Sequence, residues 1–335
     1  MPITLDPEAL AEAGVSSGAK VSLELSDTTV GAALAALVEK QRLAYVVVDG
    51  QILVTNPERR EQKLETFLLN VADLTAGQRS AEALAALVER FVEPTSWQSA
   101  GGYGKLEVSS GKLSVEQTRA IADQASEFLD QLRLAEGKPP AGKPANGARS
   151  LATRYAAAQS LLAAPVTANF RHAAPLSEIV EHLGKAAKGE ILFDGLALSA
   201  AGASPATEAE LTVAGKPLAE ALKSLLAPLR LTYRIADAKQ IVITTPEALG
   251  ERLEVEFYPA VAFPAVALVG KKQTPDELIE RIKSELDPRS WDDAGGAGLV
   301  EYEPAGYLIV LQTQPRQIEL EQLLDQWRAE QKPDR

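Results

Sequence analysis

The sequence predicts an α+β protein built from small domains in tandem, with βαββαββ and βαββα units that are duplicated along the chain. Two observations support this fold class. The segment around Trp97 (residues 93–104) returns about 194 residues later around Trp291. Upstream, residues 3–50 align with residues 191–238 without a gap. A period of this length corresponds to a domain and not to a short solenoid repeat, so we interpret the chain as a repeated two-part module.

The βαββαββ unit is complete at residues 165–247. Its strands alternate apolar and polar residues, and its helices repeat apolar residues at i, i+3, i+4 and i+7. In the first copy, residues 1–60, only the second half of this order recurs, because nothing aligns with residues 166–188. The expected elements are strands at 166–170, 191–193, 211–213, 231–235 and 241–244, a turn at 215–217, helices at 176–183 and 218–225, and in the first copy strands at 21–25, 44–48 and 52–55 with a helix carrying Val30, Ala33, Leu34 and Leu37.

The βαββα unit occurs at residues 63–134 and again at 252–330. In the second copy Thr274 is a candidate N-cap with Pro275 at the first helical position. The last helix is expected to begin beside Thr313 and Pro315. Between the modules, residues 135–164 combine a Gly- and Pro-rich linker at 137–147 with an Ala-rich helix at 151–164. The two modules are therefore predicted to be tethered and not fused.

Composition excludes several kinds of partner and site. The 335 residues, 46% of them hydrophobic, suffice for two to four small domains. A formal charge of -12 argues against nucleic acid as a partner, since phosphates are bound by Lys and Arg. The absence of cysteine excludes disulfides, thiolate metal sites and a thiol nucleophile. No apolar run is long enough to cross a bilayer, and the N-terminal residues lack the features of a signal peptide.

The residue pattern resembles a known family. The units at 165–247 and 1–60 resemble the secretin and TonB short N-terminal domain, called N0, and the βαββα units resemble the secretin N1 ring-building domain. This tandem arrangement is similar to repeats in large envelope proteins of planctomycete-like bacteria. A Ser-Trp-x-x-x-Gly-Gly insertion departs from the usual N1 pattern, and we do not expect the pore-forming role of secretins. The matching residues include Pro175-Leu176, Pro217-Leu218, Leu231-Thr232-Tyr233, Ile241 to Thr244 and Leu308-Ile309-Val310.

The repeated Trp and Gly residues are the candidate interaction or structural anchors. A phosphate loop is not expected, because a strand and no helix follows the glycines and no Lys-Ser or Lys-Thr pair is present. The glycines instead predict a flexible or bulged opening of a hairpin. A repeated tryptophan is expected to be a core anchor, with an exposed partner-binding anchor as the alternative. These candidates are Trp97, Trp291, Gly101, Gly102, Gly295 and Gly296.

The sequence indicates catalytic and metal-binding residues less strongly than it indicates the Trp and Gly anchors. Asp292 and Asp293 form an acidic pair that the first copy lacks, and a hydrolase using them is one rival hypothesis. His172 and His182 have no companion at catalytic or metal-binding spacing, so we expect surface histidines. We therefore predict a non-enzymatic chain without catalytic, cofactor-binding or metal-binding residues, and without a cofactor.

The resemblance implies a protein-interaction or assembly module of the cell envelope or periplasm, acting through domain surfaces and sheet edges. Its partner would be a protein, either itself, as a homo-oligomer, or another envelope component. The alternative is a TonB-receptor-type domain that recognises one signalling partner without forming rings. Because the first copy lacks its opening strand and helix, we expect the natural chain to begin earlier, since bare apolar stripes and open sheet edges promote aggregation.

Overall fold

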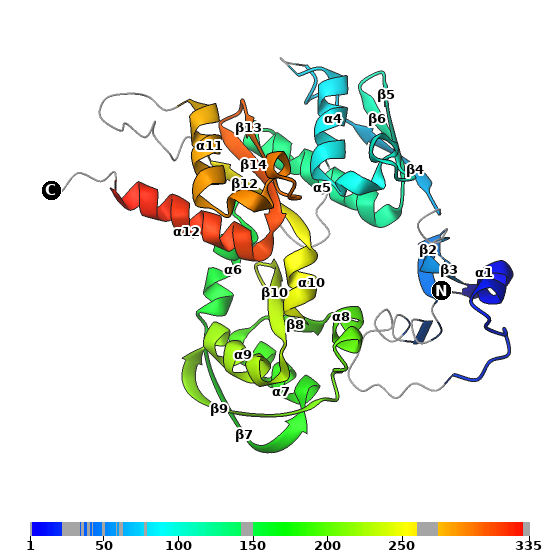
Figure 1. The fold of residues 1–335 in the computed structure, drawn as a ribbon, viewed down its shortest axis with the longest axis vertical. Helices are drawn as coiled ribbons and strands as arrows, with labels where there is room; N and C mark the ends of the chain where they lie inside the picture. The colour runs from blue at the N-terminus through cyan, green and yellow to red at the C-terminus, as the bar shows by residue number, and fades with distance from the viewer. Residues whose placement is uncertain are drawn as a thin grey trace. The chain divides into compact units, whose positions relative to one another are not determined.

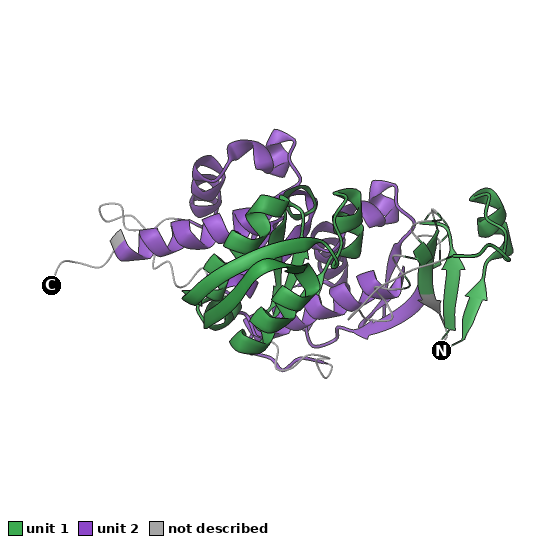
Figure 2. Cartoon of the chain, turned by 90° about the horizontal axis from the view of Figure 1, so that it is seen from below, with its two compact units in different colours: residues 1–63, 157–249 green, residues 64–156, 250–335 purple. Residues whose placement is uncertain are grey.

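The computed structural model contains two compact units, each made of two chain segments. They are residues 1–63 with 157–249, and residues 64–156 with 250–335 (Figure 2). Both units combine helices with small sheets, which confirms the α+β class. The structure describes residues 2–21, 34, 37–38, 41, 43–48, 51–57, 59, 63–76, 79–141, 150–259 and 274–330.

The complete βαββαββ unit has the predicted order of strands and longer helices. Strands β7 and β9 pair antiparallel, and they lie side by side in Figure 1. Strand β11 lies between β10, which is antiparallel to it, and β8, which is parallel. The short helix α8 has no counterpart in the sequence prediction. The elements are β7 (Pro165–Pro175), α7 (Leu176–Ala187), β8 (Glu190–Phe193), α8 (Gly195–Ala200), β9 (Glu208–Pro217), α9 (Leu218–Leu226), β10 (Thr232–Asp237) and β11 (Gln240–Thr244).

The turn predicted at residues 215–217 is wrong, because strand β9 continues through these residues. The pairing register between β7 and β9 shifts at this point. Gly215 has a φ of +61°, and its N–H donates to the hydroxyl of Thr167 at 3.0 Å. The sequence Gly-Lys-Pro therefore forms a β-bulge, in which glycine supplies the left-handed residue.

The first copy reproduces the smaller sheet of this unit. Strand β3 lies between β2, which is antiparallel, and β1, which is parallel, as β11 lies between β10 and β8. The expected strand beyond Val21 and most of the helix expected to carry Val30 to Leu37 lie outside the described residues. The described elements are β1 (Ile3–Leu5), α1 (Pro7–Glu12), β2 (Ala44–Val48) and β3 (Gln51–Thr55).

One capping arrangement occurs in both copies. The carboxylate of Asp6 accepts the N–H of Ala9 at 3.2 Å and the hydroxyl of Thr55 at 3.0 Å. Asp194 does the same at α8, where the corresponding distances, to Ala197 and Thr244, are 3.2 and 3.1 Å. An Asp in this position satisfies a free N–H at the start of the helix. The same side chain thereby ties the helix to the central strand of the sheet.

Each βαββα domain is a three-stranded antiparallel sheet with two helices on one face. The third strand of each is central, with β6 between β4 and β5, and β14 between β12 and β13. Thr274 caps α11 in a reciprocal capping box with Glu277, which confirms the predicted helix start. The first domain contains β4 (Glu65–Asn70), α4 (Ala81–Phe91), β5 (Lys105–Ser109), β6 (Lys112–Gln117) and α5 (Arg119–Ala135), and the second contains β12 (Leu253–Pro259), α11 (Pro275–Glu285), β13 (Leu299–Glu303), β14 (Tyr307–Thr313) and α12 (Gln314–Glu330).

Two further helices lie between these parts of the chain. The predicted Ala-rich helix is present as α6 (Arg154–Leu162). A short helix that the sequence pattern does not predict, α10 (Pro246–Glu251), precedes β12. Of the predicted linker, residues 142–149 lie outside the described part of the chain. Among the helices that are described, none combines the length and the apolar character needed to span a bilayer.

Candidate protein-interaction surfaces

Each βαββα domain encloses its tryptophan in a double 3-10 turn. The side chains of Trp97 and Trp291 are both 0% exposed. The indole N–H of Trp97 donates to the carbonyl of Val92 at 2.6 Å, and that of Trp291 to the carbonyl of Leu286 at 2.8 Å. A buried indole whose N–H has a partner acts as a core anchor. The turns are η1 (Pro94–Ser96) with η2 (Gln98–Ala100), and η5 (Pro288–Ser290) with η6 (Asp292–Ala294).

The repeated glycines make this turn compact. Gly101 and Gly295 end the second 3-10 turn with φ of +90° and +87°, a backbone conformation that favours glycine. At Gly102 and Gly296 a Cβ would lie within 2.3 Å of the backbone of the preceding turn. The stretch leads into a hairpin, as expected, but it does so as a packed, hydrogen-bonded turn and not as the flexible or bulged opening predicted from the glycines. These positions require glycine because two backbone segments touch.

A glutamine from the central strand closes each turn. Gln117 donates to the hydroxyl of Ser96 at 3.1 Å, and Gln312 donates to that of Ser290 at 3.0 Å. The carbonyl of each glutamine side chain accepts the next backbone N–H at 2.8 Å. The sequence pattern does not single out these glutamines, although they occupy equivalent positions in the two copies. The two tryptophans thus lie in the interior of their domains, and the four glycines form part of the turns that enclose them.

The acidic pair and His182 contact neighbouring protein groups. Lys283 lies 3.6 Å from a carboxylate oxygen of Asp292 and 3.1 Å from one of Asp293. The ring of His182 makes a 2.8 Å contact with the carbonyl of Thr167 and meets Phe170 edge-on. Within the described ranges, no group of three or more His, Asp or Glu side chains is placed to hold a metal ion. His172 is exposed.

The two βαββα domains pack against each other through unlike faces. The helices α4 and α5 of the first domain share a core with the side of the second sheet that points away from its own helices. Phe128 of α5 stacks on Phe91 at 6.0 Å between ring centroids and meets Phe257 of β12 at 5.9 Å. We call the second domain's contribution the docking face: Leu253, Val255, Phe257, Leu299, Tyr307, Ile309 and Leu311.

The second sheet is therefore covered on both sides. Its other side, with Tyr258, Val300, Leu308 and Val310, packs with helices α11 and α12. Strand β14 is consequently buried at every residue from Leu308 to Gln312. A strand covered on both faces reads as a continuous apolar run. The run Leu308-Ile309-Val310-Leu311 is thus the sequence signal for a docking face, and apolar periodicity alone does not reveal it.

The corresponding face of the first sheet is polar. Where the docking face has Ile309, Leu311 and Leu299, the first domain has Ser114, Glu116 and Lys105. Leu68, the counterpart of Phe257, is 65% exposed. Charged and hydroxyl groups resist burial against an apolar helix face, because they would lose their water. Only the second sheet is therefore suited to receive a helix face.

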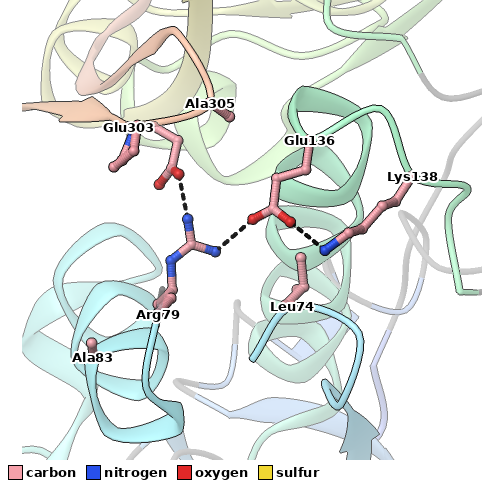
Figure 3. A pocket seen from close by; sticks show the side chains of 8 residues that line it. Leu74, Arg79, Ala83, Glu136, Lys138, Glu303 and Ala305 are labelled. Atoms are coloured by element: carbon pink, nitrogen blue, oxygen red, sulfur yellow. Dashed lines mark hydrogen bonds and ion pairs between the residues drawn. The ribbon is translucent and has the colours of Figure 1, made fainter. Parts of the chain in front are cut away.

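Ion pairs surround this apolar contact. Arg79, just before α4, pairs with Glu303 at the end of β13 and with Glu136 at 3.0 Å (Figure 3). Arg90, in the last turn of α4, pairs with Glu301. Both pairs between domains join an arginine of the first to a glutamate of the second. Burial raises the pKa of Glu303, although Arg79 opposes the shift.

A cavity of about 430 Å³ opens beside these ion pairs. Each charged side chain in its wall has a partner of opposite sign, since Lys138 pairs with Glu136 at 2.5 Å. Figure 3 shows the Arg79 guanidinium between the carboxylates of Glu136 and Glu303. The cavity therefore lies at the rim of the contact between the two domains, and the charged side chains in its wall are paired. Its lining residues are Leu74, Arg79, Ala83, Glu136, Lys138, Glu303, Pro304 and Ala305.

The chain just before α6 is anchored to the second domain. Arg154 donates to Glu256 at 2.7 Å and to the carbonyl of Val255 at 3.0 Å. The hydroxyl of Thr153 donates to Glu321 at 2.5 Å. Burial raises the pKa of Glu256 to about 7, while the charge of Arg154 opposes this shift. A buried ion pair of this kind fixes where the segment lies, since separating it leaves a buried charge alone.

Comparison with known proteins gives matches among solved structures. No family model matches the chain, and no curated protein matches it. Among solved structures, a chain from the GspC–GspD complex of the type II secretion system of enterotoxigenic Escherichia coli is similar. The sequence identity is 14%, the TM-score is 0.17, and the match covers 49% of this chain and 98% of that chain.

Proposed function

We propose that this protein is a non-enzymatic assembly and protein-interaction module of a bacterial cell envelope. The single observation that carries the proposal is the contact between the two βαββα domains. Its centre is apolar, with Phe128 and Phe257, and its rim is charged. This division into an apolar core and a polar rim is that of a specific protein–protein interface. A βαββα domain that binds another βαββα domain through a complementary face is suited to building assemblies.

The sheet edges add a second kind of surface. Among the described residues, β4 and β5 are the outer strands of the first sheet, each paired on one side only. An outer strand can accept an extended segment of another chain through backbone hydrogen bonds. The side chains of Leu68 and Tyr103 are 65% and 53% exposed at this domain. We assign these edges to protein contacts of the same assembly.

The envelope location follows from the resemblance of the units to secretin N-domains. The separate boundaries of the N0-like and N1-like units, at 165–247 and 252–330 and in the first copy at 1–60 and 63–134, belong to the same proposal. The Trp and Gly anchors hold the shape of each βαββα domain, so the interaction residues lie on the faces that they position. The partner class is protein, including further copies of this chain.

Sedimentation velocity of the purified chain over a wide concentration range tests this function. An assembly module populates discrete oligomers as concentration rises. A chain that stays monomeric throughout contradicts the proposal and favours a receptor-type domain with a single partner. Cross-linking followed by mass analysis of peptides identifies which face is used.

A further inference from the structure

The contact between the βαββα domains is heterologous. The first domain contributes a helix face and the second contributes the docking face, so neither surface can pair with itself in this way. The domains are also distant in sequence, because residues 157–249 lie between them. Nothing in the chemistry of the contact requires that both faces come from one chain. A helix face therefore fits the docking face of any copy of the protein.

The rim charges give the contact a direction. The helix face carries Arg79 and Arg90, and the docking face carries Glu301 and Glu303. Complementary potentials of this kind fix register and exclude other pairings, because like charges brought together repel each other. The polar face of the first sheet, with Lys105 and Glu116 in place of leucines, offers no second docking site. Each chain thus has one helix face and one docking face that match.

The connection between the domains has enough reach for exchange. The chain is held on the first domain as far as Ala141, whose N–H donates to Asp130 at 2.8 Å. It is held on the second domain from Thr153 onward. About a dozen residues join these points and span at most about 40 Å. A domain of this size is about 30 Å across, so this connection is long enough for the first domain to reach a neighbouring molecule.

We propose that the helix face of one chain also binds the docking face of a second copy of this chain, so that two chains exchange their first βαββα domains. This inference rests on the proposed assembly function and names the surface and the partner. Reciprocal exchange keeps the apolar centre and the ion pairs of both contacts. Exchange of an identical element costs little for that reason.

Charge-reversed variants of the full chain test the exchange. One variant carries Arg79→Glu and Arg90→Glu, and the other carries Glu301→Arg and Glu303→Arg. Within either variant the rim charges repel, whereas between the two variants both contacts are complementary. In sedimentation velocity we expect each variant alone to remain at the mass of one chain, 35.7 kDa. An equimolar mixture is expected to form a complex of two chains that contains both variants equally.

Three controls define the result. A chain that carries both Arg90→Glu and Glu301→Arg should behave as the unmodified protein, because the charges of this pair are complementary again. Reversal of Lys105 and Glu116 on the polar face should produce no complex. The milder pair Arg90→Glu and Glu301→Arg serves if the double variants lose their circular dichroism spectrum, since both side chains are partly exposed.

Two folded variants that sediment as separate chains when mixed overturn the exchange. If the unmodified protein still forms oligomers in that case, the assembly function stands and another surface carries it. If instead the mixture forms the complex while the unmodified protein is always monomeric, the two faces can bind between chains but the unmodified chain does not exchange them, and both proposals are contradicted. The exchange can therefore fail while the assembly function stands.

Discussion

Replacing Phe257 by alanine tests the docking face directly. The side chain is 1% exposed, and its ring meets that of Phe128 at 5.9 Å. A buried phenylalanine removes about 150–250 Å² from water, and its truncation in a core costs about 3–5 kcal/mol. Because Phe257 points away from the core of its own domain, this loss falls on the contact between domains. We expect the unfolding of the two domains to separate into two transitions.

Urea denaturation followed by tryptophan fluorescence is the measurement, since Trp97 reports on the first domain and Trp291 and Trp327 report on the second. The matched control is Leu68→Ala, at the equivalent position of the first sheet. Leu68 is 65% exposed, so its truncation should change the free energy of unfolding by no more than about 0.5 kcal/mol. Equal effects of the two substitutions would refute the idea that only the second sheet is a docking face.

Four further substitutions test the turn and the buried ion pair. Gly102→Ala should destabilise the protein by more than about 3 kcal/mol, because its Cβ would lie 2.3 Å from backbone atoms of Ser96. Gly101→Ala should cost about 1–2 kcal/mol, because only its φ of +90° opposes a side chain. Thermal melts of the two variants compare the cost of the steric clash with that of the backbone strain. Trp291→Phe should cost about 2–3 kcal/mol in urea denaturation, because a buried carbonyl loses its donor and a void remains. The pKa of Glu256 is raised to about 7, against 4.5 for a free side chain, so the folded state binds the proton more tightly than the unfolded state does. The free energy of unfolding should therefore fall as pH rises from about 4.5 to about 7. Glu256→Gln should flatten that slope in pH-dependent melts.

The order of elements follows from local sequence signals. Apolar stripes at helical spacing predict α7, α9 and α11, and the Thr274-Pro275 pair marks a helix start that the capping box confirms. These signals act within one turn of chain, so a single sequence carries them. The sequence pattern does not predict the short helix α8, because a single Asp cap and six residues do not establish a helical period. It does not predict the bulge at Gly215 either, because Gly-Lys-Pro is also a common turn sequence.

The docking face depends on contacts between segments far apart in the chain. Phe257 and Ile309 alternate with Tyr258 and Leu308 along their strands, so both sides of the second sheet are apolar. Sequence pattern can show that a second cover is needed. It cannot identify the cover, because the helix face that supplies it lies more than a hundred residues earlier and has the ordinary stripe of any amphipathic helix. The packing of Phe128 against Phe257 in the structure identifies which part of the chain covers the second sheet.

Comparison of the two βαββα copies distinguishes the residues that stabilise each domain from the residues that bind it to another domain. The buried indoles and the glutamines that close the turns are alike in both copies, because each domain needs the same interior to fold. The outer face of the sheet differs, with Leu68 and Glu116 in one copy and Phe257 and Leu311 in the other. A substitution at an identical pair should therefore destabilise its own domain, and one at a differing pair should change association. This contrast follows from the chain itself, since each copy is the control for the other.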